Sequence, residues 1–193
     1  GANVGYYAAH FARLVGSAGQ VICLEANPVC AYFLRANLID LGLDQARILP
    51  AAALHVNGMT RFSVNYGNTN LGTAETSGFF HHKPGQEIAV GCFSLDHLIA
   101  DFGLPAPDFL KIDVEGAELQ VLEGMERTLQ DHRPTFLLEL HGAACTQGAI
   151  SILAGRGYRF ENPATRDVYE TVDAAREAFA ADSVYQVVAR PPR

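Results

Sequence analysis

Residues 109–124, with the sequence FLKIDVEGAELQVLEG, place an apolar run of strand type directly before a run with the period of a helix. In a strand, residues i, i+2 and i+4 lie on one face, so Lys111, Asp113 and Glu115 are predicted to line up if the strand continues that far. Burying an unpaired ionised group is costly. That cost is avoided where a strand ends at the ligand crevice of an open α/β sheet. The pattern therefore predicts that Asp113 and Glu115 lie at such a crevice.

A second apolar run, TFLLELH, repeats this arrangement with Glu139 and His141 at its end. If the two strands are neighbours, both pairs of polar side chains meet at one edge of the sheet. Three simpler alternatives stay open. Glu115 can serve only the positive N-terminus of the next helix, Lys111 can neutralise a nearby acid, and His141 can be an ordinary loop histidine. A functional role is favoured most strongly for Asp113, because an idle buried carboxylate there costs the most.

Strand and helix patterns alternate along the rest of the chain. A helical pattern at 4–16 precedes an apolar strand pattern at 20–27, and Pro28 can open a second helix at its first turn. This alternation predicts an α/β fold with an open, mostly parallel sheet and helices on both faces, in a single domain at 1–193. The remaining strands are expected at 46–54, 87–95, 109–114, 135–141, 157–160 and 184–189, and the remaining helices near 28–41, 95–101, 116–130, 146–155 and 173–180.

The buried faces of the first two helices are predicted from large apolar side chains at helical spacing, and Gly42 is expected to end the second helix. These side chains are Tyr7, Phe11, Leu14 and Val15 in the first helix, and Phe33, Leu34, Leu38 and Leu41 in the second.

The alternation breaks at 55–86. Asn57-Gly58 stands between two β-prone runs and predicts a hairpin turn. The stretch 66–86 is rich in Gly, Asn and Thr and predicts a long flexible loop, of a length that is usually functional. Such a loop can close over a substrate and exclude water. Its side chains of interest are Asn70, Phe79, Phe80, His81 and His82.

Composition excludes several classes of protein. The formal net charge is −7 and no cluster of Lys and Arg is visible, which argues against nucleic acid and for a small-molecule partner. The four cysteines are scattered, as expected for reduced thiols in the cytosol. No apolar run approaches the ~20 residues of a membrane span. We therefore expect a cytoplasmic protein, and the oligomeric state is not readable from the sequence.

The first five residues, GANVG, place Gly1, Asn3 and Gly5 before a helix, where glycines allow close approach of a ligand. Glu25 ends the next strand about 20 residues later, the spacing at which an acid binds ribose hydroxyls. The third glycine of the dinucleotide fingerprint is missing. The spacing thus favours a nucleoside ligand without a pyrophosphate, although Asn3 can also be a simple turn residue.

Three blocks of the sequence together resemble the FkbM-type S-adenosylmethionine-dependent methyltransferases. The blocks are GANVGYY, CLEANPVCAYFLRANLIDLGL and FLKIDVEGAELQVLEGM, and the similarity covers most of residues 1–141 in order and spacing. The resemblance implies a class I methyltransferase fold, Rossmann-like, with a mostly parallel sheet of seven strands and one late antiparallel strand, VYQVVA. The family's first strand and an acidic residue normally precede GAN. We therefore expect an N-terminally incomplete domain with its first strand truncated, and the function assigned is that of the complete parent protein.

The resemblance also implies roles for individual residues. Gly1, Asn3 and Gly5 belong to the cofactor loop, Glu25 binds the ribose, and Asp113 faces the methionine end of S-adenosyl-L-methionine and the acceptor. The implied reaction is O-methylation of a hydroxyl on a sugar, another glycan or a natural product.

A hydroxyl acceptor must lose its proton to a base. Asp113 and His141 are the candidates for that base, with Glu139 behind them, and the sequence does not choose among the three. No metal is predicted, because adjacent histidines such as His81 and His82 are seldom a site on their own; Mg²⁺ in the acid-lined crevice is a weaker alternative. Two rival functions remain: a nicotinamide-dependent oxidoreductase, and a non-catalytic nucleoside-binding domain.

Overall fold

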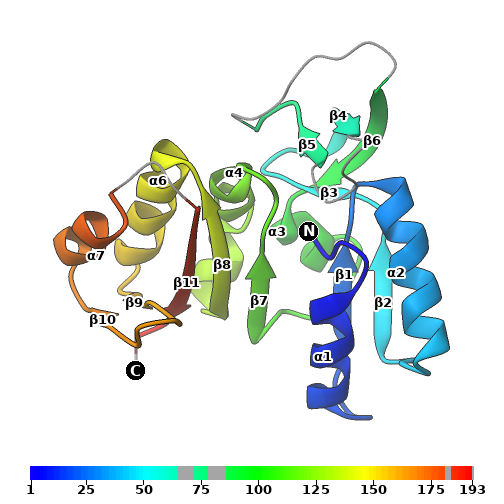
Figure 1. The fold of residues 1–193 in the computed structure, drawn as a ribbon, viewed down its shortest axis with the longest axis horizontal. Coiled ribbons are helices and arrows are strands. Elements are labelled where there is room, and N and C mark those ends of the chain that lie inside the picture. The colour runs from blue at the N-terminus through cyan, green and yellow to red at the C-terminus, as the bar shows by residue number, and fades with distance from the viewer. Residues whose placement is uncertain (65–71, 78–85, 181–183, 193) are drawn as a thin grey trace. The chain divides into compact units, whose positions relative to one another are not determined.

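The computed structural model describes residues 1–64, 72–77, 86–180 and 184–192 (Figure 1). They divide into two compact units. Unit 1 comprises Gly1–Ala53, Gly58–Glu75 and Phe80–Cys92, and unit 2 comprises Leu54–Asn57, Thr76–Phe79 and Phe93–Arg193. The expectation of a single domain stays a prediction.

The first half of unit 1 follows the predicted alternation. Helix α1 (Tyr6–Val15), strand β1 (Val21–Leu24), helix α2 (Pro28–Asp40) and strand β2 (Ala46–Leu49) occur in that order, and β1 pairs with β2 in parallel. The Asn27 side chain caps α2 by accepting a hydrogen bond from the backbone N–H of Val29, and Pro28 opens its first turn.

The buried faces of α1 and α2 differ from the prediction. Helix α1 buries Ala8, Ala9 and Ala12, whereas Leu14 is 81% exposed. Of the stripe predicted for α2, only Leu34 and Leu38 are buried; the third buried residue is Cys30. The core of unit 1 combines these small side chains with β1, because alanines let a helix approach a strand closely. The prediction failed because it assigned the largest apolar residues to the core.

Unit 1 also contains a second sheet, in which the order is β3-β6-β4-β5. It consists of β3 (Ala52–Ala53), β4 (Gly58–Val64), β5 (Gly72–Ala74) and β6 (Glu87–Phe93), and β4 is antiparallel to both β5 and β6.

This sheet corrects two predictions for 55–86. Gly58 pairs with Cys92, so Asn57-Gly58 does not form a hairpin turn; instead, the Asn57 side chain accepts a hydrogen bond from the backbone N–H of Ser94. Strand β5 lies within the stretch predicted to be a loop, because its backbone pairs with β4. The loop residues Asn70, Phe79, Phe80, His81 and His82 lie outside the described residues.

Unit 2 contains a five-stranded sheet in the order β10-β9-β11-β8-β7. The predicted antiparallel late strand is confirmed, since β11 runs antiparallel to β8 and β9. Of the four strand pairs described here, only β7–β8 is parallel, so a mostly parallel sheet is not confirmed. The strands are β7 (Phe109–Ile112), β8 (Thr135–His141), β9 (Arg159–Glu161), β10 (Val168–Tyr169) and β11 (Val184–Arg190).

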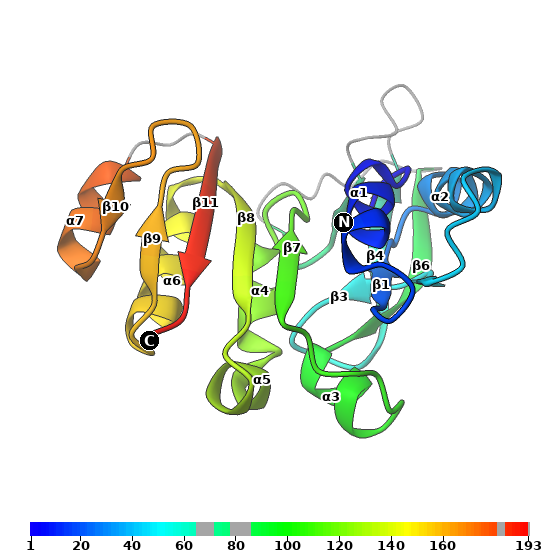
Figure 2. The same cartoon turned by 90° about the horizontal axis from the view of Figure 1, so that it is seen from below.

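Helices cover one face of this sheet (Figure 2). Phe136, Leu138 and Leu140 alternate along β8 and are fully buried, and helices α4 and α6 pack against that strand. The helices of unit 2 are α3 (Leu95–Ala100), α4 (Glu118–Glu123), α5 (Glu126–Asp131), α6 (Ala143–Ala154) and α7 (Val172–Ala178). Among the residues that the structure describes, no helix has both the length and the apolar character needed to cross a membrane.

The single helix predicted at 116–130 is divided into α4 and α5. The break falls at Gly124 and Met125, where a Cβ on Gly124 would lie 2.3 Å from the Leu54 carbonyl oxygen. Only glycine permits this close backbone approach to Leu54. The periodicity of the side chains continues through the break, which is why the sequence predicted one helix.

Candidate functional site

The glycine loop of unit 1 is held at the carboxyl end of β1. Glu25, which follows β1, is 7% exposed and accepts hydrogen bonds from two backbone N–H groups. Its Oε2 accepts from Asn3 at 2.7 Å and its Oε1 accepts from Asn27 at 2.8 Å. Glu25 therefore connects the loop to the start of α2, a structural role that the sequence did not predict. Each carboxylate oxygen has a second lone pair, so the group retains capacity for a ribose hydroxyl.

Gly5 is the one loop position that excludes a side chain on two grounds. Its φ is +98°, a conformation that L-residues rarely adopt. A Cβ at this position would also lie 2.8 Å from the Leu34 side chain of α2. Asn3 has a φ of +51° and uses its own side chain to accept the N–H of Val4, as its alternative role of turn residue predicted.

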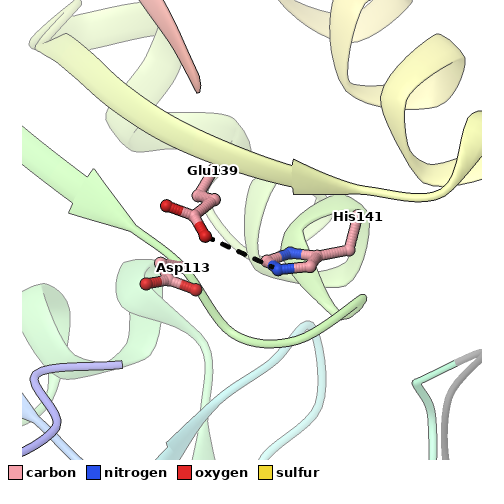
Figure 3. A group of neighbouring side chains, drawn as sticks. All are labelled: Asp113, Glu139 and His141. Carbon is pink, nitrogen blue, oxygen red and sulfur yellow. Dashed lines mark ion pairs between the residues drawn. The ribbon is translucent and has the colours of Figure 1, made fainter. Parts of the chain in front are cut away.

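The ends of β7 and β8 bring together Asp113, Glu139 and His141 in unit 2, as Figure 3 shows. One potential ligand atom from each residue lies within 4.8 Å of those of the other two. The adjacent, parallel pairing of β7 and β8 produces this arrangement, as the sequence pattern predicted. Lys111 donates to Asp113 Oδ2 at 2.7 Å, so it does neutralise a neighbouring acid.

Glu115 reaches the same cluster by a different route from the one predicted. Strand β7 ends at Ile112, and Glu115 and Gly116 then turn the chain with φ values of +52° and +90°. The carboxylate of Glu115 nevertheless lies 3.6 Å from His141 Nε2. A turn rather than the period of a strand therefore positions Glu115.

Glu118 has no solvent exposure, and its role was not predicted from the sequence. Its Oε1 accepts hydrogen bonds from the backbone N–H groups of Val114 and Gly116, both at 3.1 Å, and from His141 Nδ1 at 3.0 Å. Its Oε2 accepts from the Cys145 thiol at 3.1 Å. Glu118 thus links the turn after β7 to the end of β8 and to α6.

One signal in the sequence could have identified Glu118. It shares the helical stripe of Val121, Leu122 and Met125, all of which are buried. A carboxylate on an apolar stripe must be paired, because burying it alone is too costly. Only the carboxylates at the strand ends were considered from the sequence, so this one on the helical stripe was overlooked.

We call this group of side chains the β7–β8 acid cluster. It consists of Asp113, Glu115, Glu118, Glu139 and His141, and its electrostatics are set by the four carboxylates. Burial opposes protonation of His141, but the hydrogen bond to Glu118 and the surrounding carboxylates outweigh it and raise its pKa to about 9. Burial also opposes ionisation of Glu118, yet hydrogen bonds from His141 and Cys145 lower its pKa. Burial, reinforced by Asp113, Glu118 and Glu139, raises the pKa of Glu115. The cluster therefore attracts positive charge.

Two solved structures with a similar fold are methyltransferases. A methyltransferase FkbM from Methylobacillus flagellatus KT aligns with a TM-score of 0.60 at 17% identity, covering 98% of this chain and 41% of that one. A precorrin-6y C5,15-methyltransferase from Geobacter metallireducens GS-15 aligns with a TM-score of 0.55 at 16% identity, covering 100% of this chain and 76% of that one. The fold is therefore an α/β fold of the methyltransferase type.

The sequence itself specifies the family. The model of the methyltransferase FkbM domain matches residues 1–172, so the chain belongs to the FkbM methyltransferase family, as the three sequence blocks predicted.

Three curated relatives are each 28% identical to the chain. The 2-O-methyltransferase NoeI of Sinorhizobium fredii matches 69% of this chain and 58% of its own length. The methyltransferase sdnD of Sordaria araneosa matches 65% and 58%, and the 31-O-demethyl-FK506 methyltransferase FkbM of Streptomyces tacrolimicus matches 98% and 78%. The chain thus spans a little over half the length of the first two relatives.

Proposed function

We propose that residues 1–193 act as one S-adenosylmethionine-dependent methyltransferase domain that methylates a hydroxyl on a sugar, another glycan or a natural product. The match of the family model to residues 1–172 carries the proposal. The names of two relatives, a 2-O-methyltransferase and a 31-O-demethyl-FK506 methyltransferase, specify transfer to oxygen. We also propose that the protein acts in the cytoplasm, which is supported by the absence of a disulfide among its four cysteines, all of which are described.

The residues of the glycine loop fit a nucleoside cofactor. Gly5 lets the loop pack closely against Leu34 of α2, and the Glu25 carboxylate can accept a hydrogen bond from a ribose hydroxyl in addition to those from Asn3 and Asn27. When bound, S-adenosylmethionine supplies an electrophilic methyl carbon. The protein then has mainly to position the acceptor and remove its proton.

Asp113 is the strongest of the three candidate bases. The raised pKa of His141, about 9, means that its ring carries a proton at neutral pH and cannot accept another. Glu139 has both oxygens engaged, because Oε2 accepts a hydrogen bond from Gln186 at 3.1 Å and Oε1 lies 3.8 Å from His141 Nε2. Asp113 is held by Lys111 through one oxygen only, and its side chain is 25% exposed. It can therefore take the proton of a hydroxyl, while His141 stabilises nearby negative charge.

Ligand binding tests the choice of cofactor. S-adenosylhomocysteine should raise the apparent stability of the protein, by about 2.7 kcal/mol at 100 times its dissociation constant, since a ligand of the native state must do so. The measurement is a thermal unfolding series with S-adenosylhomocysteine and, in parallel, NADH. Stabilisation by NADH and none by S-adenosylhomocysteine would contradict the proposal and favour an oxidoreductase.

Turnover tests the base. Asp113→Asn should lower methyl transfer from labelled S-adenosylmethionine by about 10²–10⁴-fold, while S-adenosylhomocysteine still binds, because general-base catalysis typically contributes that much. The acceptors would be a panel of hydroxylated glycans and polyketides. Glu177→Gln, which changes an exposed carboxylate on α7, is the matched control. Unchanged turnover in the Asp113→Asn variant would exclude Asp113 as the base, and binding without turnover on any acceptor would support a non-catalytic domain.

A further inference from the structure

The side chains of Asp113, Glu139 and His141 have the spacing of metal ligands. Their potential ligand atoms lie within 4.8 Å of one another, and in Figure 3 the three side chains face a common space. Three donor atoms around one ion are roughly 3.0–3.6 Å apart, given bonds of about 2.1 Å from a metal to nitrogen or oxygen. The widest pair, now up to 4.8 Å apart, would have to approach by about 1–2 Å, so the side chains must rotate toward the ion to coordinate it.

Each of the three side chains is also oriented by a hydrogen bond to a residue outside the group of three. The fully buried Glu118 accepts from His141 Nδ1, Lys111 donates to Asp113 Oδ2, and Gln186 donates to Glu139 Oε2. Metal-binding histidines characteristically donate their other ring N–H to a carboxylate in this way, which directs the second nitrogen to the ion.

The remaining ring nitrogen faces the carboxylates. His141 Nε2 lies 3.8 Å from Glu139 Oε1 and 3.6 Å from Glu115 Oε2. The β7–β8 acid cluster contains four carboxylates, one of which, that of Asp113, pairs with Lys111. A divalent cation at Nε2 would offset more of this negative charge than a proton does.

We propose that Asp113, Glu139 and His141 bind a divalent first-row metal ion of the Mn²⁺ or Zn²⁺ type, and that Glu118 positions His141 for it. One imidazole with two carboxylates suits such an ion better than Mg²⁺, which prefers oxygen ligands alone. Because Lys111 occupies Asp113 Oδ2, the ion binds the other oxygen of that carboxylate.

The role of the ion in catalysis rests on the proposed function. A hydroxyl acceptor beside the ion would have a lower pKa, since a divalent ion stabilises the developing negative charge on oxygen. The hydroxyl proton passes to a carboxylate of the cluster as the bond from oxygen to the methyl carbon forms. The bond between that carbon and sulfur breaks, and the sulfur keeps its electron pair as a thioether. No further reactant is needed.

Electron paramagnetic resonance of Mn²⁺ tests the site without any assay of turnover. The protein would be tag-free, treated with EDTA and desalted, and titrated with MnCl₂ at pH 8. We expect the six-line signal of free Mn²⁺ to decrease with a stoichiometry of one ion per chain. An unchanged signal at protein concentrations of hundreds of micromolar would overturn the proposal.

Variants test which residues bind the ion. Glu139→Gln preserves the size of a partly exposed side chain and should weaken Mn²⁺ binding at least tenfold. Glu118→Gln should weaken it about 10–100-fold, the usual effect of losing an outer hydrogen-bond partner of a ligand. Glu177→Gln on α7 should bind as the unmodified protein does. Wild-type affinity in Glu139→Gln would contradict the ligand set, and far-ultraviolet circular dichroism checks that each variant is folded.

The two proposals fail in different ways. Binding of Mn²⁺ without stabilisation by S-adenosylhomocysteine would leave the metal site standing and overturn methyl transfer. Stabilisation by S-adenosylhomocysteine without binding of Mn²⁺ would overturn the metal site and leave proton removal to Asp113 alone.

Discussion

Glu25 in unit 1 and Glu118 in unit 2 are both buried carboxylates that hold a turn next to a strand, but they have different partners. The hydrogen bonds described for Glu25 come from the backbone N–H groups of Asn3 and Asn27. Glu118 accepts from two backbone N–H groups and, in addition, from an imidazole and a thiol. A buried glutamate therefore fixes a loop in unit 1, whereas in unit 2 a buried glutamate also shifts the pKa of a neighbouring histidine.

This difference separates two ways of building a site. A carboxylate bound by amides keeps its charge and shape, which suits a ligand-binding loop. A carboxylate and a histidine that share a hydrogen bond shift each other's pKa, and here Glu118 raises the pKa of His141. The comparison predicts that loss of Glu118 affects stability and chemistry together, whereas loss of Glu25 mainly affects ligand binding.

The largest expected effect is that of Glu118→Ala. We expect the free energy of unfolding to fall by about 3–5 kcal/mol, because removal of one partner from a buried, charged hydrogen-bond network leaves the others unsatisfied. Those partners are His141, the Cys145 thiol and the N–H groups of Val114 and Gly116. Equilibrium denaturation in urea measures the change.

Glu177→Ala on α7 is the control for this experiment and should change stability by less than about 0.5 kcal/mol, since its side chain is exposed. A loss in Glu118→Ala as small as that would mean that the network does not stabilise unit 2. It would also remove the distinction drawn between the two glutamates.

A smaller effect is expected from pH, because a change of pH removes the charge on His141 but not the backbone hydrogen bonds of Glu118. The pKa of His141 is raised from 6.5 to about 9 in the folded protein. The resulting stabilisation is therefore fully present below pH 6.5 and is lost as pH rises through about 9. Denaturation in metal-free buffer with EDTA, between pH 6 and pH 10, measures the decline.

His141→Gln provides the comparison for the pH series. It should be less stable than the unmodified protein at pH 6, and the difference should shrink by pH 10. The groups that face the ring are Asp113, Glu115, Glu118 and Glu139. An identical decline in both proteins would assign the pH dependence to another group.

The sequence predicted where strands β7 and β8 end better than it predicted the contacts between distant residues. Apolar runs followed by carboxylates located the ends of β7 and β8, because parallel strands bring their carboxyl ends to one edge. The helix break at Gly124 and the pairing of β4 with β6 depend on distant backbone contacts, which local periodicity cannot reveal. The partners of Glu118 were missed for the same reason, since His141 is 23 residues away in the chain.

The smallest expected change in stability is that of Glu25→Gln, about 1–2 kcal/mol. Glutamine keeps one oxygen to accept an N–H of the loop, but it turns an NH₂ group toward the other N–H and leaves it without an acceptor.

If Glu25 also accepts a ribose hydroxyl, the affinity for S-adenosylhomocysteine falls by about tenfold or more, because hydrogen bonds to charged groups contribute about 1.5–3 kcal/mol. Calorimetric titration measures the affinity, and Glu177→Gln is again the control. A loss of stability with unchanged affinity would show that Glu25 only holds the loop in place and does not bind the ligand. The two glutamates would then share one structural role, and the ribose contact would have to come from elsewhere in the protein.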